Sequence, residues 1–503
     1  MPKTMKILNK NLRYFLCALG LSLFSNLNAQ NTQYVSPASP FFNKIIKEEV
    51  NFNKPQEPIK ISALTFNRVF ICAPANHHAW IVAEKNEIIV DIEGNGLTDI
   101  PFTAFDCGIS SCLGYVYVAF QTSNGVFQCV PISYQRDTPY GISIGNFFGG
   151  NAKQILFAAA RSNEVYVLRH IGGWNFTQIT IGQGNGFPNH VAVRKSSVFT
   201  NDVLYTDEYG NLYRYNYSQT WMPVVLNNYC REGLAVADLN NDGKEDIVCS
   251  NTNYAFGNGG LYYQLNLSSD YDWSQMYVVS NVSGRWHGLT IGDLNNDNKV
   301  DIVACNASDS KVYIFRGNGG NPPTFSLLAS IYTGTSLNSC EVKVFDLDKD
   351  GDKDIVWARG GVGSGPSLGW IRNNYPNNSF TNYIIESGNY MTYGLAVGYV
   401  NNDDCPDIVA GLNNGLYVYY GTCSITPVDI PEKFEINAKI EVKGKEVKFI
   451  LNRNISDKLD IFDVSGKKLW TYYINGQQLT FKIPNSGVYV MKLRYKSYKV
   501  VIH

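Results

Sequence analysis

The sequence lacks the short motifs that identify several large enzyme classes. Its 503 residues contain no H-E-x-x-H motif and no P-loop, so nothing in them indicates a zinc protease or a nucleotide-phosphate site. No C-x-x-C pair is present, which argues against a zinc ribbon. Charged residues make up only 17% of the chain, and no apolar run reaches the roughly twenty residues that a membrane-spanning helix requires. Glycine (44 copies) and tyrosine (33 copies) are abundant, which is typical of short strands joined by many turns.

The first 29 residues have the pattern of a secretory signal peptide. A basic start, Lys3 to Arg13, precedes an apolar stretch at 14–24, and Ala29 offers a small residue for cleavage. A membrane anchor is the alternative, but about eleven apolar residues are too few to span a bilayer. We therefore expect an extension at 30–58 in an exported protein. It would be secreted or held at the outer-membrane cell surface, with no transmembrane segment after cleavage.

All but one of the eleven cysteines lie beyond this segment. In an oxidising compartment some of them are expected to pair, and Cys107 with Cys112 is the simplest local pair. The alternative is that Cys249 and Cys305, which each follow an aliphatic strand, are buried thiols.

An acidic nine-residue pattern, D-x-[DN]-x-[DN]-G-x-x-D, recurs and is followed each time by an aliphatic run. It reads DLNNDGKED from Asp238, DLNNDNKVD from Asp293 and DLDKDGDKD from Asp346, with a looser copy, DIEGNGLTD, from Asp91. Oxygen ligands at positions 1, 3, 5, 7 and 9 surround a hard cation when position 6 allows a sharp turn. We expect three to four structural Ca²⁺ ions. The expected ligands are Asp91, Glu93, Asn95, Asp99, Asp238, Asn240, Asp242, Lys244 (carbonyl), Asp246, Asp293, Asn295, Asp297, Lys299 (carbonyl), Asp301, Asp346, Asp348, Asp350, Asp352 (carbonyl) and Asp354.

The copies differ in expected affinity. The Asp346 copy has the most carboxylates and is expected to bind most tightly, whereas the longer Glu93 weakens the Asp91 copy. Asn298 replaces the turn glycine in the Asp293 copy, which is tolerable because asparagine enters the left-handed region. An EF-hand is disfavoured, since position 12 of the best copy is Cys249 and the flanks are strand-like. Metal-free Asx turns remain the alternative.

Worn copies fill the gaps between the clear ones. They begin at Asn146, Val193 and Tyr399, which gives seven starts spaced 45 to 55 residues apart. The Asn146 and Val193 copies are expected to be empty, and the Tyr399 copy to bind weakly or not at all. Each copy is followed by an alternating, tyrosine-rich run, which predicts a four-stranded blade per repeat.

Seven such blades predict a closed, all-β, seven-bladed β-propeller over residues 59–424. The strand-like segment 59–71 precedes the first blade, and we expect it to supply the missing outer strand of the last one. The alternative is an open stack or separate sheets. The repeats resemble the FG-GAP (VCBS) repeat of integrin α-chain propellers over roughly residues 60–424. Four loops match that pattern and three depart from it.

A linker at 425–434 leads to a C-terminal region, 435–503, whose alternating runs predict a small β-sandwich. Leu459 to Trp470 reads as a strand-Gly-Lys-strand unit, and Gly487-Val488-Tyr489 and the basic Lys496 to His503 follow it. These features resemble the C-terminal sorting domain of type IX secretion substrates, which implies export by that machinery. An ordinary carbohydrate-binding or Ig-like module is the alternative. The acidic middle of the chain argues against nucleic acid as a partner.

Polar or aromatic residues precede each expected inner strand, on the face opposite the acidic loops. Ring symmetry is expected to gather them at the mouth of the central channel, a common ligand site in propellers. The candidate ligand-binding residues are Tyr140, His190, Arg231, Glu232, Trp286, His287, Glu341 and Tyr393.

The expected role of this mouth is binding or adhesion to a glycan or protein ligand, with no catalytic residue assigned. One alternative is a carbohydrate-active enzyme such as a polysaccharide lyase, in which Arg231, Glu232, His287 and Glu341 meet in one pocket. A transition metal on the histidines and glutamates is a further possibility. Two further alternatives are that the protein is a purely structural surface component without a ligand, and that these residues are ordinary turn residues.

Overall fold

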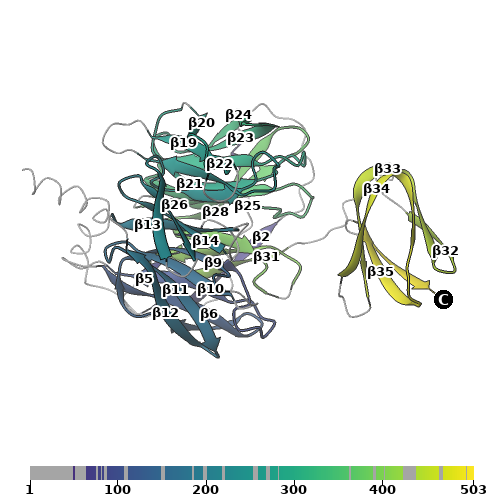
Figure 1. Cartoon of the computed structure of the whole chain (residues 1–503), viewed down its shortest axis with the longest axis horizontal. Coiled ribbons are helices and arrows are strands. Elements are labelled where there is room, and N and C mark those ends of the chain that lie inside the picture. The colour runs from purple at the N-terminus through teal and green to yellow at the C-terminus, as the bar shows by residue number, and fades with distance from the viewer. Residues whose placement is uncertain are drawn as a thin grey trace, which may run out of the picture. The chain divides into compact units, whose positions relative to one another are not determined.

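A computed structural model describes residues 49–50 and most of 64–422 and 438–502. The gaps in these ranges are 75–77, 81, 84–87, 107–111, 149–152, 184–185, 196–200, 218–220, 253–258, 268–271, 281, 362–363, 389–391, 402, 464–467 and 494–495. The expected signal peptide, the linker and Cys107 lie outside the described residues. The chain divides into two compact units, Met1–Ser424 and Ile425–His503 (Figure 1).

Every helix or strand assigned in the described residues is a β-strand, and the strands up to residue 422 form seven antiparallel sheets. We number these sheets 1 to 7 in chain order. Sheet 1 contains β3 (His78–Trp80), β5 (Ile100–Phe105), β6 (Leu113–Ser123) and β7 (Val126–Pro131), with β8 (Arg136–Asp137) beside β6. Sheet 2 contains β9 (Pro139–Gly145), β10 (Gln154–Ala159), β11 (Glu164–Gly172) and β12 (Asn175–Gln183), with β4 (Val82–Ala83) parallel to β9. Sheet 3 contains β13 (Pro188–Lys195), β14 (Asn201–Asp207), β15 (Leu212–Tyr217) and β16 (Trp221–Asn227).

Sheets 4 to 6 repeat the same four-strand meander. Sheet 4 contains β17 (Leu234–Ala237), β18 (Asp246–Asn251), β19 (Gly260–Gln264) and β20 (Tyr277–Ser280). Sheet 5 contains β21 (Trp286–Gly292), β22 (Asp301–Asn306), β23 (Lys311–Gly320) and β24 (Pro323–Tyr332). Sheet 6 contains β25 (Ser339–Phe345), β26 (Asp354–Gly360), β27 (Pro366–Asn373) and β28 (Phe380–Ser387), with β1 (Glu49–Val50) at its edge.

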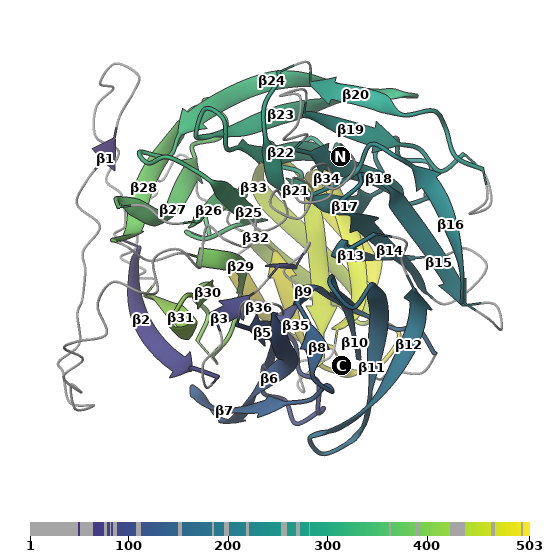
Figure 2. The same cartoon turned by 90° about the vertical axis from the view of Figure 1, so that its left-hand side faces the viewer.

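Sheet 7 joins the two ends of the array. Its β29 (Thr392–Gly398), β30 (Asp407–Leu412) and β31 (Gly415–Thr422) are completed by β2 (Thr65–Cys72), which pairs antiparallel with β31. The prediction that the segment before the first repeat supplies this outer strand is confirmed for its described part. The sheets lie around a central axis, with β9, β13, β17, β21, β25 and β29 innermost (Figure 2).

The core is distributed between neighbouring sheets rather than gathered at one centre. Separate buried clusters join sheets 2 and 3, 3 and 4, 4 and 5, 5 and 6, and 6 and 7. Another contains Ile100 of sheet 1, Ile155 of sheet 2 and Val409 of sheet 7. Aliphatic strands such as β22 and β26 are buried along their whole length because both faces meet another sheet. In sheet 1 the tyrosine-rich run after the acidic loop is β6, the third strand, and β7 is the outer strand.

The C-terminal unit contains one five-stranded sheet. Its strands are β32 (Ala438–Lys443), β33 (Glu446–Phe462), β34 (Lys468–Lys482), β35 (Gly487–Leu493) and β36 (Lys496–Ile502). The long β33 pairs with β32, β34 and β35. The buried cluster of this unit includes Leu459, Ile461 and Met491. Within the described part of the chain there is no helix of the length and apolarity that crossing a membrane requires.

Candidate calcium loops and channel-mouth site

The acidic loops connect the first and second strands of their sheets, and each is tied down by the aspartate at position 9. In the Asp238 loop, Asp246 Oδ2 accepts the amide of Leu239 at 2.9 Å, and Oδ1 accepts the amide of Asn266 in the third-strand region at 2.8 Å. Asp99, Asp301, Asp354 and Asp407 accept the same two kinds of amide. The position-9 carboxylate therefore fixes the loop to its own sheet independently of any ion.

The turn at position 6 has the expected geometry. Gly243 and Gly351 have positive φ angles of 84° and 99°, and Asn298 takes the same region at 62°. The prediction that asparagine substitutes for glycine at this turn is confirmed. At position 1, Asp238 Oδ2 accepts the Gly243 amide at 2.7 Å, which closes the loop around its acidic side chains.

The Asp346 loop has the donor set that best fits a hard cation. One carboxylate oxygen each from Asp346, Asp348 and Asp354 lie within 4.8 Å of one another. Buried oxygens of Asp346, Asp348 and Asp352 have no hydrogen-bond partner among the described residues. Burial, together with the neighbouring aspartates, raises the pKa of Asp352 to about 8, and burial raises that of Asp348 to about 6 despite Arg372. Such mutual repulsion is relieved when a cation binds.

The loops at Asp238 and Asp293 carry a lysine close to their acidic side chains. Lys244 Nζ lies 3.0 Å from Asp242 Oδ2, and Lys299 Nζ lies 3.4 Å from Asp297 Oδ2. These ammonium groups offset part of the negative charge, as the Arg372 guanidinium does in the Asp346 loop, where it lies 2.6 Å from Asp348 Oδ2 and 3.1 Å from Asp350 Oδ2. In the Asp91 loop, Glu93 Oε1 accepts the Trp174 indole N–H at 3.1 Å, which gives that side chain a partner besides a metal.

The worn copies replace the position-9 aspartate contacts in two ways. In sheet 2, Gln154 Oε1 accepts the Phe147 amide at 2.7 Å, as an aspartate does in the acidic loops. In sheet 3, fully buried Asp202 pairs with the guanidinium groups of Arg194 and Arg214, the latter at 2.7 Å. In sheet 3 arginines of the first and third strands therefore neutralise the buried carboxylate.

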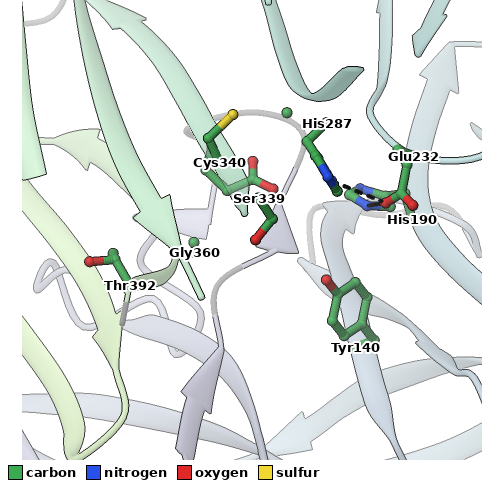
Figure 3. A pocket seen from close by; sticks show the side chains of 11 residues that line it. Tyr140, His190, Glu232, His287, Ser339, Cys340, Gly360 and Thr392 are labelled. Atoms are coloured by element: carbon green, nitrogen blue, oxygen red, sulfur yellow. Dashed lines mark ion pairs between the residues drawn. The ribbon is translucent and has the colours of Figure 1, made fainter. Parts of the chain in front are cut away.

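At the channel mouth, five predicted residues from five consecutive sheets line one hollow. They are Tyr140, His190, Glu232, His287 and Glu341, and the hollow is small and partly open to solvent (Figure 3). Small residues, including Gly288, Gly360 and Gly394, line it as well. A Cβ at Gly288 would lie 2.5 Å from the Cys340 carbonyl oxygen, so the close packing there requires glycine.

Glu232 is the centre of the polar contacts. Its Oε2 lies 3.6 Å from His190 Nε2 and 3.9 Å from His287 Nδ1, and its Oε1 lies 3.3 Å from Thr252 Oγ1 and 3.9 Å from Arg231 Nε. Backbone bonds from Arg231 and Glu232 to the Ser250 carbonyl hold this turn in place.

The charge states at the hollow follow from these contacts. Burial opposes ionisation of Glu232, but the His190 hydrogen bond and the positive charges of His287, His190 and Arg231 lower its pKa to about 2. Burial lowers the pKa of His287 to about 4, against the pull of Glu232. At neutral pH the hollow therefore holds an ionised carboxylate beside a neutral imidazole. Glu341 is compensated by Lys343 Nζ at 3.5 Å.

Not all predicted mouth residues lie there. Trp286 is fully buried among Tyr313 and Phe315, and its indole N–H donates to the Val282 carbonyl, so its assignment to the mouth is wrong. It alternates with His287 along β21, and the inward residue of that pair is the histidine. Arg231 lies beside the hollow and contacts it through Glu232, and the Tyr393 side chain is outside the described residues.

Sequence reasoning missed Ser339, Thr392 and Lys343. The first two line the hollow, and Lys343, although buried, points its amine to Glu341. Alternation along β25 places Lys343 on the same face as Glu341, a signal that was readable once that strand was assigned. Two G-x-S-x-G matches, at 141–145 and 365–369, carry buried Ser143 and Ser367 within strands, so neither forms a nucleophile elbow. His78 contacts the Asn413 carbonyl instead of a ligand site, and His77 lies outside the described residues.

Three disulfides connect described cysteines: Cys72–Cys129, Cys230–Cys249 and Cys305–Cys340. The alternative of buried free thiols at Cys249 and Cys305 is therefore wrong. Cys112 and Cys405 are disulfide-bonded too. Because Cys107 is not described, its pairing with Cys112 stays a prediction.

Comparison with known proteins identifies the repeat. Residues 238–304 and 293–357 match the FG-GAP-like repeat. Integrin alpha-6 of Gallus gallus is 31% identical over 146 residues, which are 24% of this chain and 13% of that protein, so the chain spans about an eighth of this curated relative. In its described residues the chain is thus all-β, with FG-GAP-like repeats at 238–304 and 293–357 and with its sheets arranged around a central axis.

Three solved structures align with much of the chain at low sequence identity. The complex of BBS1N with ARL6DN has a TM-score of 0.44 at 12% identity, covering 71% of this chain and 94% of that chain. The WD40 β-propeller domain of Doa1 has a TM-score of 0.43 at 9% identity, covering 71% and 97%. PorZ, described as an essential bacterial surface component of the type-IX secretion system of Porphyromonas gingivalis, has a TM-score of 0.42 at 12% identity, covering 80% and 57%.

Proposed function

We propose that this chain is an exported, calcium-stabilised, seven-bladed β-propeller that binds a glycan at its channel mouth. The observation that carries the proposal is the convergence of Tyr140, His190, Glu232, His287 and Glu341 from five sheets on one hollow. Hollows that combine a few converging polar groups with an aromatic ring are typical of ligand sites. This one is small and is lined by both polar and apolar atoms, which favours a small ligand group over the broad surface that a protein partner requires.

The direct test is a printed array of defined saccharides, probed with residues 30–424 in calcium. Wild-type protein is expected to bind a restricted set of glycans, and Glu232→Gln to lose that binding because it removes the charge at the centre of the hollow. Glu446→Gln, at an exposed position of the C-terminal unit, is the matched control when both variants are made in the full chain. Absence of any glycan signal for the wild type would overturn the glycan proposal, and specific capture of a protein instead would redirect it.

Calcium is proposed as a structural ligand of the acidic loops. The residues that would hold it in the Asp346 loop are Asp346, Asp348, Asp350, the Asp352 carbonyl and Asp354, and the orphan buried oxygens there support this fit. Bound Ca²⁺ would neutralise the clustered carboxylates and tie the two ends of each loop together. Elemental analysis after dialysis is expected to give three to four calcium ions per chain, whereas none would refute the proposal.

A second candidate is a carbohydrate-active enzyme with its site in the same hollow. It is favoured because Glu232, His287 and Glu341 share this hollow and Arg231 pairs with Glu232, the arrangement predicted for that alternative. A neutral imidazole at His287 can accept a proton, and the Tyr140 hydroxyl can donate one to a leaving oxygen. Incubation with uronate polysaccharides tests for a lyase, since cleavage creates an unsaturated product that absorbs ultraviolet light. Product that is formed by wild type and lost in His287→Ala would establish this candidate.

We further propose that the C-terminal sheet directs export by the type IX machinery to the cell surface or medium. Disulfides in the first unit support an oxidising destination. Deleting residues 435–503 is expected to leave the protein in the periplasm of a type IX-competent host. Unchanged secretion of the truncated chain would refute the role of this region.

A further inference from the structure

The rim beside the mouth hollow carries two exposed tyrosines on turns that contact each other. Tyr209 is 57% exposed on the turn between β14 and β15, and Tyr229 is 46% exposed on the turn before β17. The amide of Cys230 donates to the Gly210 carbonyl at 3.0 Å, which joins the two turns directly. Exposed aromatic rings placed together at the edge of a pocket are a signature of a binding surface.

Both turns are held firmly by the rest of the structure. Buried Asp207 accepts the amides of Tyr209 and Asn211 at 2.9 and 2.8 Å. The Tyr229 carbonyl accepts the Asn251 amide group at 3.0 Å, its ring lies 5.3 Å from that of Tyr262, and the adjacent Cys230 is fixed by its disulfide. The two rings are therefore presented with little conformational freedom left to lose on binding.

A line of charged groups connects this rim to the hollow. Arg231 lies between two carboxylates, with one guanidinium nitrogen 4.0 Å from Glu208 and another 3.9 Å from Glu232. Glu208 and Arg231 are each partly exposed, whereas Glu232 faces the hollow. Polar side chains therefore lie between the hollow and the two turns that carry the tyrosines.

We propose that Tyr209, Tyr229, Glu208 and Arg231 form a second subsite, which takes the next sugar of an oligosaccharide whose end lies in the hollow. The tyrosine rings would cover the apolar face of that sugar, while Glu208 and Arg231 would bond its hydroxyl groups. Because acidic and basic groups are paired along this path, the ligand is a neutral sugar chain rather than a polyanion. This inference rests on the proposed glycan site and extends it from one sugar to at least two.

The test is a titration of the full chain, in calcium, with mono- to hexasaccharides of the glycan class found on the array. Affinity is expected to rise from one to two or three sugars. Tyr209→Ala and Tyr229→Ala are each expected to lower oligosaccharide affinity about three- to tenfold and to leave monosaccharide affinity unchanged. Tyr473→Ala, at a 70% exposed tyrosine of the C-terminal unit, is the matched control.

The outcomes separate the two proposals. If length has no effect and both tyrosine variants bind like wild type, the subsite is refuted while the hollow stands. If no saccharide binds at any length, both are refuted. If polyanionic chains bind better than neutral ones, the neutral-ligand part is wrong.

Discussion

Sheets 3 and 6 both bury carboxylates between their first and second strands, but the groups around these carboxylates differ. In sheet 6 the loop between the first two strands gathers five aspartates, and its buried oxygens are short of partners. In sheet 3 the corresponding buried carboxylate, Asp202, pairs with Arg194 and Arg214, and the Trp273 ring lies 5.3 Å from the Arg194 guanidinium. Both sheets supply arginines from their own strands, since Arg372 of β27 pairs with Asp348 and Asp350. The five aspartates of sheet 6 outnumber this arginine, and we propose that an external cation neutralises the rest.

This difference shows that the backbone contacts made by the side chain at position 9 occur in more sheets than the full set of acidic ligands does. Asp354 accepts two backbone amides, and neutral Gln154 of sheet 2 accepts one of the same kind. A repeat that lacks the acidic ligands can therefore keep this backbone anchor, provided that some acceptor stays at position 9. Sheets 2 and 3 are expected to be insensitive to calcium, and sheets 4 to 6 to depend on it.

The largest expected effect is at Asp202. Asp202→Ala leaves two buried guanidinium groups without their carboxylate, and breaking such a pair costs about 3–5 kcal/mol. The free energy of unfolding, measured by urea titration, should fall by this amount equally in calcium and in chelator. Asp202→Asn, which keeps an acceptor, is the control and should lose less. A loss seen only in calcium would mean that sheet 3 holds an ion after all.

This distinction was only partly visible in the sequence. The seven repeat starts, the acidic loops and the strand that completes sheet 7 follow from spacing and from alternation, which are local signals. The Asp202 pairing was missed because Arg214 lies twelve residues on, in another strand, and only the fold brings it to the carboxylate. Trp286 was misplaced for a related reason. Adjacent residues of a strand point to opposite faces, so an error of one residue assigns a core side chain to the channel mouth.

The next effect is at the Asp346 loop. Asp348→Ala removes a ligand and part of the carboxylate repulsion, so it should abolish most of the stabilisation that calcium gives this loop. A ligand present at about one hundred times its Kd contributes about 2.7 kcal/mol. Thermal melts with and without calcium should therefore differ less for Asp348→Ala than for wild type. An unchanged calcium response would show that this loop is not a calcium site.

The mouth joins the two kinds of sheet, because Glu232 of sheet 4 contacts His190 of sheet 3 and His287 of sheet 5. The pKa of His287 falls from 6.5 when unfolded to about 4 when folded, so the unfolded chain takes up the proton first as the pH falls. Its contribution to the free energy of unfolding is fully present above pH 6.5 and is lost towards pH 4, by about 3 kcal/mol. The pKa of Glu232 is lowered from its ordinary 4.5 to about 2. Its contribution to the free energy of unfolding is therefore also lost as the pH falls below 4.5.

Urea titrations from pH 7 to pH 4 in saturating calcium test this point. The difference between wild type and His287→Gln is the informative quantity, because it removes the contribution of the acidic loops. Wild type should lose more stability than the variant between pH 6.5 and pH 4. Parallel curves would mean that the pKa of His287 is the same in the folded and in the unfolded chain.

The smallest effect is at Gln154, and it separates anchoring from metal binding most cleanly. Gln154→Ala removes the acceptor for the Phe147 amide but creates no unpaired charge, so it should cost about 1 kcal/mol. Gln154→Glu restores an acceptor and should recover most of this loss without creating a calcium response, since the Asn146 copy lacks the other ligands. The measurement is the midpoint of urea unfolding with and without calcium. A calcium-dependent gain in Gln154→Glu would show that a single position-9 carboxylate is enough to rebuild a metal loop, and that the two kinds of sheet differ less than their structures indicate.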